Sequence, residues 1–171
     1  PDGWHLVDTT LEAQWVLLEE RHWAVDCRYQ LQLPTGEEGG GFGNGALDHS
    51  LMLPVRYSLS RSSFFMTPGL LLPGEPSGTD ADINTRPMAH LLLGAGHAFT
   101  QTLSLIAQVN YYSSPLEETG IDKLDNGSLE LGLGFRYLLS PGLKFELAFC
   151  EDLTRAAPDF NLHLRLSVVR D

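Results

Sequence analysis

Polar and apolar residues alternate along the last third of the chain, from Ser128 to Val168. Successive side chains of a β-strand point to opposite faces, so a period of two predicts strands with one apolar and one polar face. Ser140-Pro141-Gly142 interrupts the alternation with residues typical of a turn. The pattern therefore predicts three strands, at 128–139, 143–150 and 160–168.

The same alternation occurs upstream, less regularly in places. Pro54 is expected to produce a bulge in its segment, and Pro68-Gly69 weakens the next one. Short and long connections alternate between the segments, which is typical of an antiparallel up-and-down sheet. The strands expected in this part of the chain are 7–17, 23–33, 49–60, 64–72, 88–99 and 103–112, so that about nine are predicted in all.

Strands of about ten residues, joined directly, are what a transmembrane β-barrel requires. The apolar runs of the chain are only a few residues long, far short of the roughly 18–20 that a spanning helix needs. Short connections at one end and long ones at the other match the periplasmic turns and extracellular loops of outer-membrane barrels. We predict one all-β domain, 1–171, forming an antiparallel up-and-down (meander) transmembrane β-barrel of eight to ten strands in the bacterial outer membrane.

The composition of the two faces predicts which one points outward. Nine strands with four to six large apolar side chains each would overfill the interior of a soluble barrel. The polar face carries glycines, which weaken a solvent-exposed strand but leave room in a narrow lumen for long charged side chains. These residues are Gly94, Gly96, Gly132 and Gly134. We therefore expect the apolar face to contact lipid; a soluble lipocalin-like barrel that binds an apolar ligand is the alternative.

Aromatic residues gather near both ends of the expected strands, as in the interfacial girdles of membrane barrels. Near the short turns they are Trp15, Trp23, Tyr57, Phe65, Phe99, Tyr137 and Phe145, and nearer the long loops Phe42, Tyr111, Tyr112, Phe149 and Phe160.

The expected strand number is odd, whereas bacterial barrels have an even number and both termini in the periplasm. Two explanations stay open: the sequence is the C-terminal portion of a larger barrel and lacks at least one upstream strand, or the first strand is misassigned.

The net charge of −11 argues against nucleic acid as a partner and leaves outer-membrane lipid and lipopolysaccharide as the expected surroundings. Ten of the 22 acidic residues fall in three expected loops. They are Glu37, Glu38 and Asp48; Glu75, Asp80 and Asp82; and Glu117, Glu118, Asp122 and Asp125. We interpret them as solvated loop charges, because no spacing matches a calcium-binding loop.

Two cysteines are present, Cys27 on the apolar face and Cys150 on the polar face, so no disulfide is expected between them. Neither lies in a metal-binding or redox motif. No metal or other cofactor is predicted.

Charged residues of both signs fall on the polar face and are expected to line the lumen. They are Glu12, Asp26, Arg28, Arg56, His90, Glu130, Arg136, Lys144, Glu146, His163 and Arg165. Such a set forms either a salt-bridged network that plugs a narrow barrel or the lining of a small selective channel. A barrel enzyme is the weaker hypothesis: Glu151, Asp152, Asp159 and His163 match no standard ligand spacing, and no nucleophile elbow is present. We therefore predict no enzymatic activity and no catalytic residue.

Several short motifs resemble a known family. They are Leu33-Pro34-Thr35-Gly36, Leu72-Pro73-Gly74, Ser113-Ser114-Pro115, Tyr137 with Ser140-Pro141, and above all 149–153 with Ala157-Pro158-Asp159-Phe160 and His163-Leu164. From about Trp15 to Arg165 the chain resembles the proteobacterial family catalogued as domain of unknown function 3187, which is grouped with outer-membrane barrels.

The resemblance implies a membrane barrel with further sequence at the N-terminus and carries over no catalytic residue or substrate. The chain departs from barrels in general at its end, Val168-Val169-Arg170-Asp171, which lacks the terminal aromatic residue of the usual assembly signal.

Overall fold

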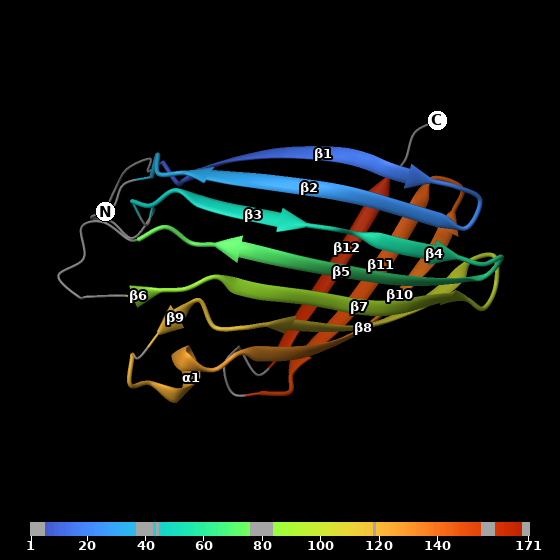
Figure 1. Cartoon of the computed structure of the whole chain (residues 1–171). Coiled ribbons are helices and arrows are strands. Elements are labelled where there is room, and N and C mark those ends of the chain that lie inside the picture. The colour runs from blue at the N-terminus through green and yellow to red at the C-terminus, as the bar shows by residue number, and fades with distance from the viewer. Residues whose placement is uncertain are drawn as a thin grey trace.

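The chain folds into a large antiparallel β-sheet (Figure 1). The computed structural model describes residues 6–36, 43, 45–75, 84–117, 119–154 and 160–168. The strands of the large sheet are β1 (Thr9–Glu19), β2 (Trp23–Leu33), β3 (Asp48–Met52), β4 (Val55–Ser58), β5 (Ser62–Leu72), β7 (Met88–Ala98), β8 (Leu103–Tyr112), β10 (Ser128–Ser140), β11 (Leu143–Asp152) and β12 (Phe160–Val168).

The strands follow one another in the sheet in chain order, β1-β2-β3-β5-β7-β8-β10-β11-β12, and every neighbouring pair is antiparallel. β3 and β4 occupy one position in this order, between β2 and β5, so the ten strands fill nine positions. The predicted all-β meander is confirmed. The predicted closed barrel is not, because β1 and β12 are the two free edges of the sheet among the described residues.

Pro54 divides the strand expected at 49–60, because proline has no N–H for the sheet ladder. The sheet nevertheless continues across the break. Leu53 N donates to Pro68 O at 2.9 Å on one side, and Asp26 N donates to Pro54 O at 2.9 Å on the other.

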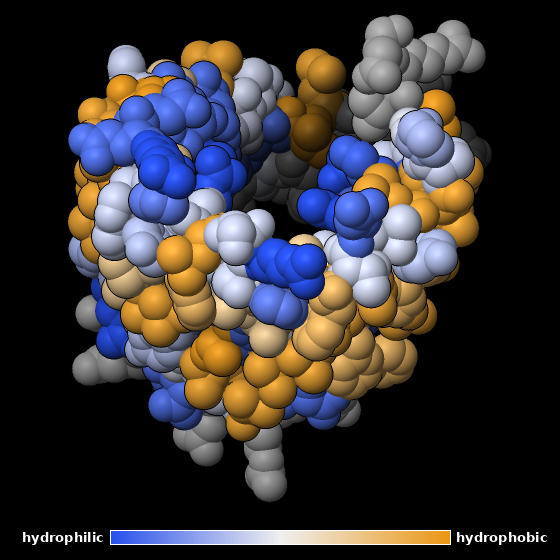
Figure 2. Space-filling view, turned by 90° about the vertical axis from the view of Figure 1, so that its right-hand side faces the viewer, coloured by the Kyte–Doolittle hydropathy of each residue, from blue (hydrophilic) through white to orange (hydrophobic). Residues whose placement is uncertain are grey.

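The sheet is strongly curved, so that β10–β12 cross behind the first strands in Figure 1. Large apolar side chains cover its outer, convex face, and polar side chains gather around the hollow inside (Figure 2). The only buried hydrophobic residue among those described is Ala46, 4% exposed. The described part of the chain therefore has no apolar core, while leucines such as Leu133 and Leu164 are 50% and 67% exposed.

No helix in the described ranges combines the length and the apolar character that crossing a membrane requires.

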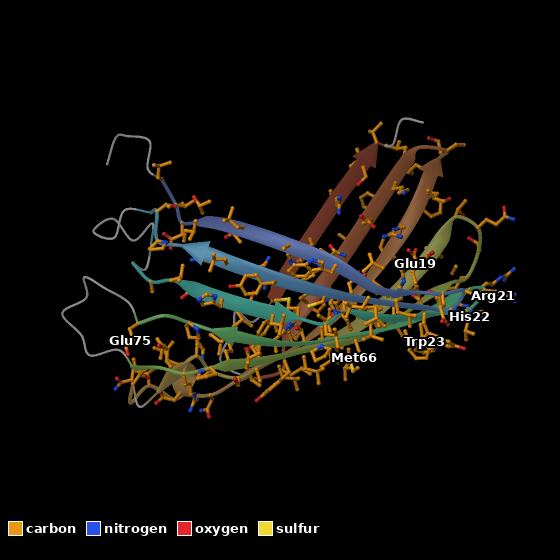
Figure 3. The ribbon with its side chains drawn as sticks, turned by 45° about the horizontal axis from the view of Figure 1, so that its top comes forward. Glu19, Arg21, His22, Trp23, Met66 and Glu75 are labelled. Carbon is orange, nitrogen blue, oxygen red and sulfur yellow. The ribbon has the colours of Figure 1, made fainter. Side chains whose placement is uncertain are left out.

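The two ends of the sheet differ, as predicted. Glu19, Arg21, His22 and Trp23 mark the end with short turns, and Glu75 marks the end with long loops (Figure 3). At the short-turn end the predicted turn at 140–142 is confirmed, with Gly142 at a φ of 98° that favours glycine.

At the long-loop end two connections form a small ordered cap that was not predicted. β6 (Asn84–Thr85) pairs with β9 (Leu116–Glu117), and α1 (Asp122–Asp125) follows. Arg86 joins these parts, because its Nε donates to Ser114 O at 3.0 Å and its Nη2 to Asp125 O at 3.2 Å. Ser114 is 4% exposed, and its hydroxyl donates to Leu124 O.

Two further expectations have an outcome here. Cys27 and Cys150 are both free, as predicted. Asp48 lies in β3 rather than in a loop, and it accepts a hydrogen bond from Gly74 N at 2.8 Å. Of the other expected loop acids, Glu37, Glu38, Asp80, Asp82 and Glu118 lie outside the described residues.

Phe65 does not belong to the aromatic girdle, and this part of the prediction is wrong. It lies directly across the β5–β7 ladder from Gly94, and its ring occupies the space on the inner side that a Cβ at position 94 would enter. Its neighbours Phe64 and Met66 are the residues of β5 that point outward here, 50% and 41% exposed.

Candidate solute site in the inner hollow

A row of directly opposed residues crosses the inner face near the short turns. The register places Ser104 of β8 opposite Arg136 of β10, Arg136 opposite Glu146 of β11, and Glu146 opposite Arg165 of β12. Because strands lie about 4.8 Å apart, long side chains in such a row meet across the ladder. Three charged residues that are far apart in sequence are thereby brought together.

Glu146 is the centre of this group and pairs with both arginines. Arg136 Nε lies 2.6 Å from Glu146 Oε1, and Arg165 Nε lies 3.8 Å from Oε2. The side chain of Glu146 is 26% exposed, against 58% for Arg136 and 77% for Arg165. The carboxylate is thus the more enclosed member, and the two guanidinium groups reach past it into the open space.

The next row toward the sheet centre consists mostly of small residues. Gly96 of β7 is opposite Ile106, Ile106 opposite Gly134, and Gly134 opposite Ala148. His163 of β12 ends this row, opposite Ala148. Side chains this small cannot fill the space in front of the sheet, so this row forms the floor of a hollow.

The hollow has a volume of about 540 Å³, in the range typical of sites for small molecules. Its lining comes from β4, β5, β7, β8, β10, β11, β12 and the turn between β4 and β5, and no lining residue belongs to β1, β2 or β3. Polar groups on the lining include Ser58, Ser60, Arg61, Ser63, Ser104, Gln108, Arg136, Glu146, His163 and Arg165. All of these lie in the half of the sheet near the short turns.

Toward the long loops the inner face carries larger side chains that pack on one another. His90 of β7 is 8% exposed and stacks on Tyr112 of β8, with ring centroids 4.5 Å apart. Its Nε2 is hydrogen-bonded to Asn110 Oδ1 at 2.8 Å. Phe65 covers Gly94, which is four residues along β7 from His90. These side chains come from the adjacent strands β5, β7 and β8 and lie on the inner face on the long-loop side of the hollow; we call them the His90 layer (Phe65, His90, Asn110 and Tyr112).

Two buried polar atoms on this face, His90 Nδ1 and Arg28 Nε, have no hydrogen-bond partner among the described residues.

Amide side chains accompany the acids on the wall formed by β1 and β2. Gln30 Nε2 donates to Glu12 Oε2 at 2.7 Å, and Gln14 Nε2 donates to Asp26 Oδ2 at 2.9 Å. These acids are therefore held by neutral partners on their own wall and do not reach the hollow.

The eleven predicted lumen residues are thus divided among three places. Arg136, Glu146, His163 and Arg165 come together at the hollow. Lys144 lies on the same face of β11 as Glu146, two residues nearer the turn. Glu12, Asp26, Arg28 and Arg56 belong to the β1–β4 wall. His90 is part of the His90 layer, and Glu130 lies beside it, opposite Asn110.

The sequence analysis missed Arg61, and it wrongly assigned Tyr112 to the aromatic girdle, whereas the ring of Tyr112 lies on the inner face against His90. Arg61 follows β4 in a turn, where strand alternation assigns no face. Tyr112 is at the strand end, and its contact with His90 depends on the register of β7 with β8.

The residues considered for a hydrolytic or metal site do not form one where they are described. Asp152 accepts hydrogen bonds from the backbone and hydroxyl of Thr154, and His163 lies four ladder steps away, opposite Ala148. Asp159 lies outside the described residues. Within the described ranges no group of three or more metal-ligating side chains is present.

A family model described as "Protein of unknown function (DUF3187)" matches residues 8–168, nearly the whole chain. No curated protein matches the chain.

Proposed function

Since the chain belongs to the DUF3187 family, we propose that it is an outer-membrane β-barrel whose lumen is closed toward the long loops and hollow toward the short turns. In this proposal the charged inner face makes a largely plugged structural barrel rather than a wide pore. The hollow is then a vestibule open to the periplasmic side, because outer-membrane barrels place their short turns in the periplasm.

The observation that carries the proposal is the outward apolar face without an apolar core. A soluble domain of about 150 residues buries roughly 68–70% of the surface of its unfolded chain. Here Leu162, Leu164 and Leu166 of β12 are 60%, 67% and 59% exposed, and Ala46 is the one buried hydrophobic residue described. Exposed apolar area costs about 25 cal/mol per Å² in water but nothing comparable in lipid.

The two free edges also bear on the proposal. Inside a bilayer an unpaired backbone N–H or C=O costs several kcal/mol, so an open edge is not tolerated there. Nine antiparallel positions make β1 and β12 run in the same direction. One further strand, antiparallel to both, would pair the two edges and give the even number that bacterial barrels have. We therefore include such a closing strand in the proposal.

The His90 layer supports a closed lumen over an open channel. His90 is 8% exposed between neighbours on β5 and β8, and in this proposal a solute would have to displace a stacked, hydrogen-bonded pair to pass. The soluble lipocalin-like alternative requires an apolar interior. The inner hollow instead carries Arg136, Glu146 and Arg165.

The test is to refold the protein in an uncharged detergent and to compare unheated with boiled samples by gel migration. A folded barrel is expected to migrate differently before and after heating, and the same preparation is expected to give no steady conductance in planar bilayers. A sample that is monodisperse in detergent-free buffer would contradict the membrane barrel. An ohmic pore at all voltages would contradict the closed lumen and favour the channel hypothesis.

A further inference from the structure

The hollow carries positive charge in a strongly acidic protein. Three guanidinium groups line it, those of Arg61, Arg136 and Arg165, against the single carboxylate of Glu146. The whole chain, in contrast, has a net charge of −11. A local excess of the opposite sign at a concave, ligand-sized surface is not explained by a need for solubility.

The carboxylate cannot neutralise this excess. Glu146 holds Arg136 at 2.6 Å and reaches Arg165 only at 3.8 Å, so one negative charge is shared between two positive ones. Asp26, on the opposite wall of the inner face, is engaged by Gln14 and does not line the hollow. Lys144 and His163 on the same inner face add no negative charge.

Neutral donors lie on the same lining as the arginines. The hydroxyl groups of Ser58, Ser63 and Ser104 and the amide of Gln108 are on the same lining. Guanidinium groups bind carboxylate and phosphate oxygens with two parallel hydrogen bonds, and hydroxyl donors complete the coordination of such oxyanions. The floor of Gly96, Gly134 and Ala148 leaves the space that the rest of a small molecule would fill.

We propose that the hollow binds a small solute carrying a carboxylate or phosphate group, held by Arg136 and Arg165 and oriented by the serine hydroxyls. Arg61 completes the positive rim from the β4–β5 turn. The proposal rests on the proposed function for the side from which the solute enters. It places the site at the periplasmic mouth of a lumen that the His90 layer closes. It adds the chemical class of the ligand.

The test uses two probes, citrate for carboxylates and inorganic phosphate, titrated calorimetrically into the protein refolded in uncharged detergent. Spermidine serves as the oppositely charged control probe. We expect at least one of the two anions to bind with a stoichiometry of one and spermidine not to compete.

Three variants locate the site. Arg165→Gln removes a guanidinium with the looser ion pair, leaves the Arg136–Glu146 pair intact, and is expected to weaken anion binding about tenfold or more. Glu146→Gln removes the competing carboxylate and is expected to strengthen binding. Arg21→Gln is the matched control, since Arg21 lies at the same end of the molecule but not on the hollow (Figure 3).

Two results would overturn the proposal: no binding of either anion to protein that shows heat-modifiable migration, or equal weakening by Arg165→Gln and Arg21→Gln. The second would mean a general effect of net charge. Because migration and conductance are measured on the same preparation, failure of the anion site is distinguishable from failure of the barrel.

If Arg165→Gln did not fold, Arg61→Gln would replace it. It removes another guanidinium from the rim of the hollow, and the same weakening is expected.

Discussion

Phe65 and Gly94 face each other across the β5–β7 ladder, and the phenylalanine ring lies over the glycine on the inner side of the sheet. A Cβ at position 94 would overlap the ring and would also lie 2.9 Å from the carbonyl oxygen of Ala107. Glycine is therefore required here by close approach. The pair explains how a large aromatic side chain fits on the inner face of the sheet.

Gly94→Ala is accordingly expected to destabilise the folded protein by about 1–3 kcal/mol, the cost typical of overpacking. The free energy of unfolding in urea, measured on protein refolded in lipid vesicles, checks this. Gly96→Ala on the same strand and face is the control, because the nearest atom to its new Cβ is the flexible Ser63 Oγ at 3.1 Å. Equal losses for both variants would contradict the packing argument.

Removing the aromatic part of the His90 layer is expected to open the lumen. Tyr112→Ala deletes the ring that stacks on His90 at 4.5 Å, so the variant should show a conductance in planar bilayers, whereas none is expected of the unaltered protein. Tyr111→Ala serves as the control, since Tyr111 is the next residue of β8 and points outward, 41% exposed. If neither variant conducted, or if both did, the His90 layer would not be the barrier.

Charge on the outer face should prevent membrane insertion, whereas charge on the inner face should be tolerated. Leu133→Arg places a guanidinium on the outward face of β10, where a position near the bilayer midplane costs about 2–4 kcal/mol. Gln108→Arg places the same group in the hollow, one ladder step away. The yield of heat-modifiable protein measures the difference, and a soluble fold would show the reverse preference.

A pH dependence is expected at the long-loop cap. Hydrogen bonds from the hydroxyl and amide of Thr119, at 2.7 and 2.9 Å, hold the pKa of Asp125 below its usual value of 3.8. Because the folded-state pKa is lowered, the carboxylate stabilises the cap above the unfolded-state value, and this contribution is lost as the pH falls through the folded pKa. NMR titration of Asp125 checks the shift.

Thr119→Val removes the hydroxyl donor and should raise the pKa of Asp125 toward 3.8, while Thr100→Val at the opposite end should leave it unchanged. If the pKa of Asp125 were the same in the Thr119→Val variant, the Thr119 hydroxyl would not be the main cause of the shift.

The sheet could be predicted from sequence because each strand carries its own signal. The bounds expected for β8 and β12 agree with the structure, and the break at Pro54 occurs where proline removes a ladder hydrogen bond. The two-residue strands β6 and β9 are too short to show a periodicity, and their pairing is accompanied by the hydrogen bond from Arg86 to Ser114, which joins the two loops.

From the sequence one could predict the face of the sheet on which the site residues lie, but not the point on that face where they meet. Alternation assigned Arg136, Glu146, His163 and Arg165 to the inner side, but their meeting depends on the register of two ladders, β10–β11 and β11–β12. The inward Phe65 shows the limit of the method. It interrupts the alternation of a strand whose outward neighbours, Phe64 and Met66, are apolar too, so hydropathy alone cannot choose its face.

The central claim is that the apolar outer face contacts lipid, and tryptophan quenching tests it most directly. Trp15 and Trp23 lie on that face, 52% and 45% exposed. In vesicles of lipids brominated along their acyl chains, we expect strong quenching of the tryptophan fluorescence compared with unbrominated lipids. Unchanged fluorescence in the brominated vesicles, from a protein that stays folded and monodisperse without lipid or detergent, would contradict the account.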